Sequence, residues 1–242
     1  MPVSRTFQRW LLVVVGVSTL LLATPDPLAD AKGKAKGKAP KAPLAEGDVV
    51  ETMAQLRDLN GKVLDLGLLC GPAARMYNPA RPKALLLDIY MTTCVPCNAA
   101  LPLLGELAAK LEPRGLRTLL ISLDGTEHAG PDGVSNATLR EKVAAAHLAD
   151  SNIVRDPGQV LAEDLDVVTN DPAKGRTVSV PRTFLLDEDC RIRGLYTSLE
   201  ESRQLLEESF EKILTAPPPD ATPGKGKGKG KGKGKGKAKG GK

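Results

Sequence analysis

The chain has 242 residues, of which 41% are hydrophobic and only 3% are aromatic, and its formal net charge is +5. Residues 32–43 and 216–242 consist mainly of Ala, Lys, Gly and Pro, so neither stretch can bury a core of its own. The residues between them, 44–215, have the length of one ordinary domain, and we expect a single folded domain there.

The basic charge belongs to the two ends of the chain. Residues 1–43 carry 7 basic and 2 acidic side chains, and residues 216–242 carry 9 and 1, which leaves 18 basic and 26 acidic side chains between them. The expected domain is therefore acidic, with a formal charge of 18 − 26 = −8. The Gly-Lys tail has no aromatic side chains on which bases could stack, so no specific nucleic-acid partner is expected.

The first 31 residues have the features of a signal peptide. Arg5 and Arg9 precede the apolar run Trp10–Ala23, and a polar segment then ends at Ala29-Asp30-Ala31, a small-x-small cleavage pattern. The apolar run is short for a membrane span, which needs roughly 20 residues. We expect an exported protein, periplasmic or secreted, with an uncleaved membrane anchor as the alternative.

The apolar pattern of residues 44–215 predicts an α/β fold. Ala84–Tyr90 is a continuous apolar run apart from Asp88, which favours a central strand that is buried on both faces. Residues 166–180 are expected to be a loop. The other expected elements, in chain order, are a hairpin over Met53–Leu68 with a two-residue turn at Asn60-Gly61, a helix over Val95–Leu111, a strand over Leu116–Leu123, a helix over Thr138–Leu148 capped by Ser135 or Asn136, a short helix over Gln159–Leu165, a hairpin of Thr183–Leu186 and Ile192–Thr197, and a helix over Leu199–Leu214. This order predicts a mixed central sheet flanked by helices, with an N-terminal β-hairpin.

The motif with the clearest chemistry is Cys94-Val95-Pro96-Cys97, at the start of the expected helix. At a helix N-terminus the first thiol is exposed, and free N–H groups and the helix dipole favour its thiolate form. Such a thiolate attacks a disulfide, and the second cysteine then resolves the mixed disulfide. A structural zinc site would need two further ligands at a paired spacing, and none is present, so no metal or cofactor is expected.

The run Leu85–Cys97 resembles the strand, active-site loop and helix start of thioredoxins. Asp88 falls on the buried acidic position of that family, Pro102 on its helix-kinking proline, and Val180-Pro181 on its cis-proline loop. The pattern is most similar to the TlpA and ResA group of exported thiol–disulfide oxidoreductases, over about residues 49–214. Two positions depart from that group: Thr93 stands where Trp is common, and Cys190 stands at a turn glycine.

This resemblance implies the roles of the site residues. Cys94 is the expected nucleophile, Cys97 the resolving thiol and Asp88 a proton acceptor. Pro181 is expected to complete the catalytic site beside the dithiol. Substrate would dock on four further residues, namely Val180, Thr93, Val95 and Pro96.

The remaining cysteines and histidines leave alternatives open. Cys70 and Cys190 are candidates for a structural disulfide, with two buried free thiols as the alternative. His128 and His147 are expected to be surface residues without a catalytic role.

We therefore expect an extracytoplasmic enzyme that exchanges disulfides with protein substrates, together with a redox partner that supplies or accepts electrons. The resemblance implies that it acts as a reductant, and the residues themselves leave the role of an oxidant open. The main alternative is a non-catalytic thioredoxin-fold adaptor, in which the Lys-Gly tail attaches the domain to an anionic polymer or membrane surface. A third class, copper handling, would need a wider cysteine spacing and a downstream His that this chain lacks.

Overall fold

The computed structural model describes residues 43–50, 54–125, 133–171, 173 and 175–216, and all of these belong to the second of the two units into which the chain divides, 42–242. The expected signal peptide, nearly all of the expected linker and tail, and His128 lie outside the described residues. Within those residues, no helix combines the length and the apolar character that a membrane crossing requires.

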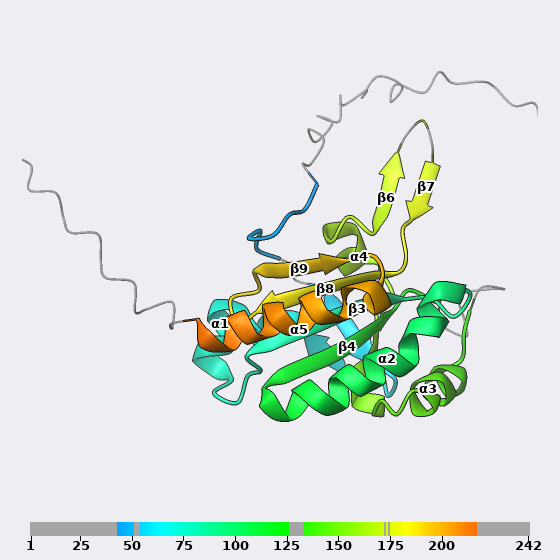
Figure 1. The fold of residues 1–242 in the computed structure, drawn as a ribbon. Coiled ribbons are helices and arrows are strands. Elements are labelled where there is room, and N and C mark those ends of the chain that lie inside the picture. The colour runs from blue at the N-terminus through cyan, green and yellow to red at the C-terminus, as the bar shows by residue number, and fades with distance from the viewer. Residues whose placement is uncertain (1–42, 51–53, 126–132, 172, 174, 217–242) are drawn as a thin grey trace, which may run out of the picture. The chain divides into compact units, whose positions relative to one another are not determined.

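A seven-stranded mixed sheet with the order β2-β1-β5-β4-β3-β8-β9 forms the centre of the fold (Figure 1). The central strands β3, β4 and β5 are parallel, and every other neighbouring pair is antiparallel. The strands are β1 (Gln55–Asp58), β2 (Val63–Asp65), β3 (Ala84–Tyr90), β4 (Leu116–Ser122), β5 (Ile153–Arg155), β8 (Arg182–Asp187) and β9 (Ile192–Tyr196). The predicted mixed sheet is therefore confirmed.

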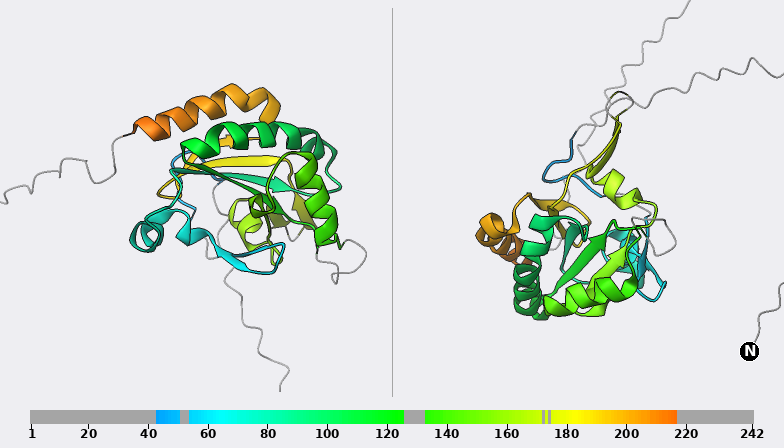
Figure 2. Two further views of the ribbon diagram at one scale, coloured as in Figure 1. Left: turned by 90° about the horizontal axis from the view of Figure 1, so that it is seen from below. Right: turned by 90° about the vertical axis from the view of Figure 1, so that its right-hand side faces the viewer.

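Helices cover both faces of this sheet (Figure 2). The helices are α1 (Gly71–Tyr77), α2 (Val95–Leu111), α3 (Asn136–Ala145), α4 (Val160–Asp164) and α5 (Leu199–Thr215). Short 3₁₀ turns lie at Leu66–Leu68, Glu112–Arg114 and Asp150–Asn152. The buried side chains of α2, α3 and α5 pack into one core cluster, and those of α4 pack into the other.

The central strand β3 is buried along its whole length. Side chains alternate between the faces of a strand, so Leu86 and Tyr90 enter the cluster under α2, whereas Leu87 and Ile89 enter the cluster on the opposite face. This double burial explains why the sequence of β3 is almost continuously apolar.

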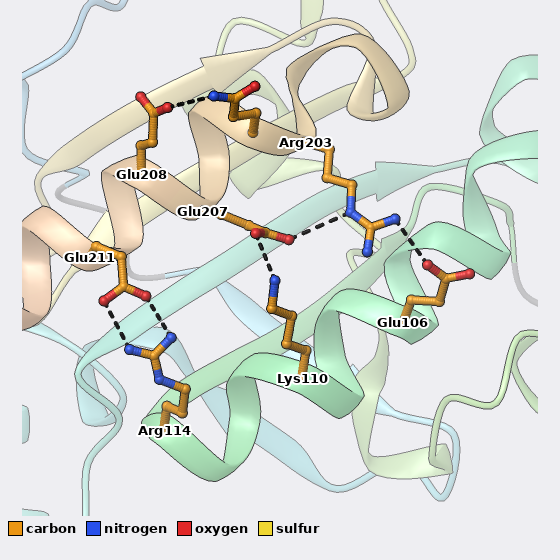
Figure 3. A network of polar contacts seen from close by, with 8 residues as sticks. Glu106, Lys110, Arg114, Arg203, Glu207, Glu208 and Glu211 are labelled. Carbon is orange, nitrogen blue, oxygen red and sulfur yellow. Dashed lines mark hydrogen bonds and ion pairs between the residues drawn. The ribbon is translucent and has the colours of Figure 1, made fainter.

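Helices α2 and α5 lie side by side, and ion pairs connect them (Figure 3). Lys110 contacts Glu207 at 2.7 Å, and Arg203 contacts Glu106 at 3.0 Å. The Lys110 ammonium also lowers the pKa of Glu207. All of these side chains are partly exposed, so each pair contributes no more than about 1 kcal/mol, and apolar packing provides most of the contact.

Helix α2 also approaches the end of α3 closely, at Gly105. A Cβ atom at this position would overlap the backbone carbonyl oxygen of Ala146. Pro102 lies inside the same helix, at the position where the family resemblance places a proline. Packing on α3 and α5 therefore fixes the helix that begins at the Cys-x-x-Cys motif.

Several element predictions were wrong in detail. Residues 166–180 are not a loop, because β6 (Val168–Asp171) and β7 (Gly175–Val178) pair there as an antiparallel hairpin. Helix α1 was not predicted. The first hairpin turn includes Leu59 as well as Asn60 and Gly61, since the Gly61 N–H donates to the Asp58 carbonyl.

Candidate active site

Cys94 and Cys97 are placed by the junction between β3 and α2. Strand β3 ends at Tyr90, and Cys94 is the N-cap residue of α2. The two cysteines form a disulfide with a Cα–Cα distance of 5.2 Å. The backbone N–H of Cys97 donates to the Cys94 Sγ at 3.1 Å, so one N–H group of the first helical turn points toward this sulfur.

The two sulfurs differ in their access to solvent. Cys97 is 1% exposed, whereas Cys94 is half-buried. Thr93, Val95 and Pro96 surround Cys94 with exposed side chains, and Val95 is 78% exposed. A reacting partner can therefore reach Cys94 but not Cys97.

Asp88 lies on the same face of the sheet as this cysteine pair. It follows the alternation of Leu86 and Tyr90, whose side chains join the cluster that contains Cys97. Asp88 is 3% exposed, and the Thr183 hydroxyl donates to its Oδ1 at 2.6 Å. Burial raises the pKa of Asp88 to about 7, and the hydrogen bond from Thr183 lowers it by a smaller amount.

The Val180-Pro181 peptide bond is cis, and β8 begins at the next residue, Arg182. Arg182 is paired with Ile89 near the end of β3 at which the chain continues to Cys94. Val180 also packs against the same core cluster as Cys94. The structure thus places this dipeptide at the dithiol end of the sheet.

A set of polar residues that sequence analysis did not identify holds the loop before Cys94. Asp124 follows β4 and accepts hydrogen bonds from the N–H and the hydroxyl of Thr92, the latter at 2.9 Å. The Asn98 amide donates to the carbonyls of Thr92 and Cys94, both at 2.9 Å. Tyr90 donates to the Asn98 side chain, and burial followed by the Asp124 charge raises the pKa of Tyr90 to about 12.

Cys70 and Cys190 form a second disulfide with a Cα–Cα distance of 5.2 Å. Cys190 lies in the turn after β8, which ends at Asp187 opposite Ala84, the first residue of β3. This bond therefore lies at the end of the sheet opposite the dithiol. Cys190 has a left-handed φ of 58°, a conformation that glycine adopts more readily.

Among the residues that the structure describes, no group of three or more His, Cys, Asp or Glu side chains could hold a metal ion. His147 lies just after α3, with a φ of 58°, and no described contact connects it to the cysteines.

Comparison with known proteins finds a family model, curated relatives and similar solved structures. The model of the AhpC/TSA family matches residues 75–195. The thiol–disulfide oxidoreductase ResA of Bacillus thuringiensis is 24% identical over 156 residues, which cover 64% of this chain and 72% of that protein. ResA of Oceanobacillus iheyensis is 38% identical over 45 residues, or 19% of this chain and 23% of that protein.

Among solved structures, a putative thiol:disulfide interchange protein DsbE from Chlorobium tepidum superposes with a TM-score of 0.51 at 17% identity. The match covers 71% of this chain and 99% of that one. At this identity the likeness establishes the fold, which is thioredoxin-like.

Proposed function

The chain belongs to the AhpC/TSA family and is a thioredoxin-like thiol–disulfide oxidoreductase, and from this premise we propose that it reduces disulfides of protein substrates outside the cytoplasm through Cys94 and Cys97. The observation that carries the proposal is the unequal exposure of the two sulfurs at the start of α2. This difference supports Cys94 as the accessible nucleophile and Cys97 as the protected, resolving thiol.

In the first step the reduced Cys94 thiolate attacks one sulfur of the substrate disulfide. A mixed disulfide forms, and the other substrate sulfur leaves as a thiolate. The N–H of Cys97 and the dipole of α2 stabilise the thiolate form of Cys94. Val180, Pro181 and the exposed Thr93, Val95 and Pro96 are proposed to dock the substrate around this sulfur.

In the second step Cys97 loses its proton and attacks the Cys94 sulfur. The Cys94–Cys97 disulfide forms, and the second substrate sulfur leaves, so two electrons have passed from the dithiol to the substrate. We propose Asp88 as the acceptor of the Cys97 proton. Its pKa of about 7 suits a general base near neutral pH, and it shares the buried face with Cys97.

Measuring the alkylation of the reduced protein as a function of pH tests these roles. Cys94 should react with an apparent pKa well below the value of about 8.5 for a free thiol, and Cys97 should react only after unfolding. Two thiols that react equally slowly near neutral pH would contradict the catalytic assignment. Peptide mapping of the labelled sites distinguishes the four cysteines.

The direction of exchange is tested by the equilibrium of the Cys94–Cys97 couple with glutathione. A potential below about −200 mV would agree with a reductant, whereas one near −120 mV would indicate an oxidant. A redox partner of matching potential must then return two electrons to Cys94 and Cys97 in each cycle.

The location and the role of the tail are also part of the proposal. Residues 1–31 support export, and the Lys-Gly repeat supports attachment to an anionic polymer or membrane surface. Intact-mass analysis of the exported protein should find Lys32 as the first residue. A protein without residues 216–242 should keep its exchange activity and lose binding to anionic vesicles, whereas a non-catalytic adaptor would show no exchange activity in either form.

A further inference from the structure

We propose that the outer edge of β7, continued by Val180, pairs with an extended segment of the substrate polypeptide next to its target disulfide. The inference rests on the proposed function, because it concerns how the substrate of Cys94 is held. It extends the docking site from the dithiol onto the β6–β7 hairpin, which projects away from the seven-stranded sheet (Figures 1 and 2).

The register of the hairpin determines which backbone groups face outward. β6 and β7 are antiparallel, with Thr169 opposite Thr177. The Ser179 N–H donates to the Val167 carbonyl at 2.8 Å, which continues the same register beyond the strands. Hydrogen-bonded and non-bonded pairs alternate in an antiparallel ladder, so the Thr169–Thr177 pair is bonded and the adjacent pairs on either side are not.

The non-bonded residues of β7 are Arg176 and Val178. Their N–H and C=O groups therefore point away from β6, toward the outer edge. Residues 175–179 are all exposed, so solvent reaches this edge along the whole strand. Because every second residue faces the same way, the next residue with outward groups after Val178 is Val180. Val180 lies at the dithiol end of the sheet, so the row of outward groups leads toward Cys94.

This position determines the kind of occupant. A partner that pairs with the edge and also presents a sulfur to Cys94 must be a polypeptide in extended conformation that carries the target cysteine. Arg176 and Val180 are separated by about 13 Å of extended chain, since a strand rises about 3.3 Å per residue. A small disulfide at Cys94 cannot reach Arg176, whereas a segment of about five residues can. Addition of a strand to an exposed sheet edge is a common mode of peptide recognition.

Trapping the mixed disulfide tests the inference without altering the hairpin. The protein used is the Cys97→Ser variant, with Cys94 reduced and the Cys70–Cys190 disulfide intact. Cys94 is joined by a mixed disulfide either to an extended peptide of about twelve residues with one central cysteine, or to hydroxyethyl thiol. Amide exchange of Arg176 and Val178 should become at least about tenfold slower with the peptide only, because their N–H groups gain partners. The Asn170 amide, on the opposite edge of the hairpin, is the internal control.

Equal protection on both edges, or none at Arg176 and Val178, would overturn the inference. If neither probe forms a mixed disulfide with Cys94, the proposed function fails instead. The two failures are therefore distinguishable.

Proline substitution gives a second test with a matched control. Arg176 and Asn170 face each other in a non-bonded pair of the hairpin. Arg176→Pro therefore removes an outward N–H of β7 and spares the hydrogen bonds between β6 and β7. Asn170→Pro removes an outward N–H from the opposite edge, that of β6, and spares the same bonds. The ratio of kcat/KM for a disulfide-linked unfolded polypeptide to that for hydroxyethyl disulfide should fall about tenfold in Arg176→Pro, the effect of roughly one hydrogen bond. Asn170→Pro and Arg176→Ala should keep the wild-type ratio. An unchanged ratio in Arg176→Pro, or an equal fall of the ratio in Asn170→Pro, would refute the pairing of substrate with the outer edge of β7.

Discussion

Replacing Asp88 with Asn should stabilise the oxidised protein near neutral pH. The substitution keeps the shape of the side chain and an acceptor for the Thr183 hydroxyl. It removes a buried carboxyl group from β3, the strand that lies between β4 and β8. Burial of an ionised carboxylate without a cation beside it is unfavourable, and an amide at this position avoids that cost.

The size of the effect follows from the pKa of about 7, compared with 3.8 for an unperturbed group. Below pH 3.8 the carboxyl is protonated in both the folded and the unfolded state, so it contributes no penalty. Between that pH and about 7 the unfolded chain ionises while folded Asp88 keeps its proton, and the free energy of unfolding falls by about 1.4 kcal/mol per pH unit. The full loss is roughly 4 kcal/mol and is constant above about pH 7.

The assay is urea unfolding followed by circular dichroism, with both disulfides intact, at several values between about pH 4 and pH 8. The difference between Asp88→Asn and the wild type should grow by roughly 4 kcal/mol across this range and then become constant. Glu141→Gln, at an exposed position of α3, controls for the loss of one negative charge. Stability differences that stay constant with pH would refute the assignment of Asp88 as a buried group with a raised pKa.

The same variant separates a structural from a chemical role. If Asp88 accepts the proton of Cys97, Asp88→Asn should slow the resolving step, and the mixed disulfide between Cys94 and the substrate should accumulate. Turnover at the wild-type rate between about pH 5.5 and pH 8 would leave Asp88 with a structural role only.

Three further outcomes follow from the packing and the covalent structure. Gly105→Ala should lower the free energy of unfolding by about 2 kcal/mol in urea titrations, because the overlap with the Ala146 carbonyl outweighs the better helix propensity of alanine; a stabilised variant would contradict the close approach. Replacing Cys70 and Cys190 together with Ala should cost roughly 4 to 5 kcal/mol in the same assay, since the bond closes a loop over a separation of 120 residues. Exchange with hydroxyethyl disulfide should continue in that variant, and its loss would link the second disulfide to the chemistry. Asn98→Ala should reduce kcat/KM for small disulfides several-fold, because two carbonyls around the dithiol lose their donor; wild-type kinetics would show that the amide does not position the loop.

The sequence predicted the parts of this fold whose pattern is regular. The apolar run of β3 and the helical spacing after Cys94 indicated the strand and helix that meet at the dithiol, and both lie where they were expected. Strand β5 was too short to assign from its own residues, although it pairs with both β1 and β4.

The β6–β7 hairpin was missed for a physical reason. Seven of its eight strand residues are exposed, so the strands show no alternation of apolar and polar side chains. The residues that hold the active-site loop were missed for another reason. Asp124 binds Thr92 over a separation of 32 residues, because the end of β4 lies beside the end of β3, so no local spacing indicates this contact. Asn98 is close in sequence to its partners Thr92 and Cys94, but a single asparagine in the first turn of a helix does not by itself indicate hydrogen bonds to the preceding loop.

The bond between Cys70 and Cys190 makes the chain from one to the other a covalent ring, and β3, α2 and both reactive cysteines lie inside it. Cleavage of any one peptide bond within the ring would give two fragments that remain joined through sulfur. A protease that cuts once between these residues would therefore release no piece of the domain. The nick would become visible on a denaturing gel only after a reductant had opened the bond.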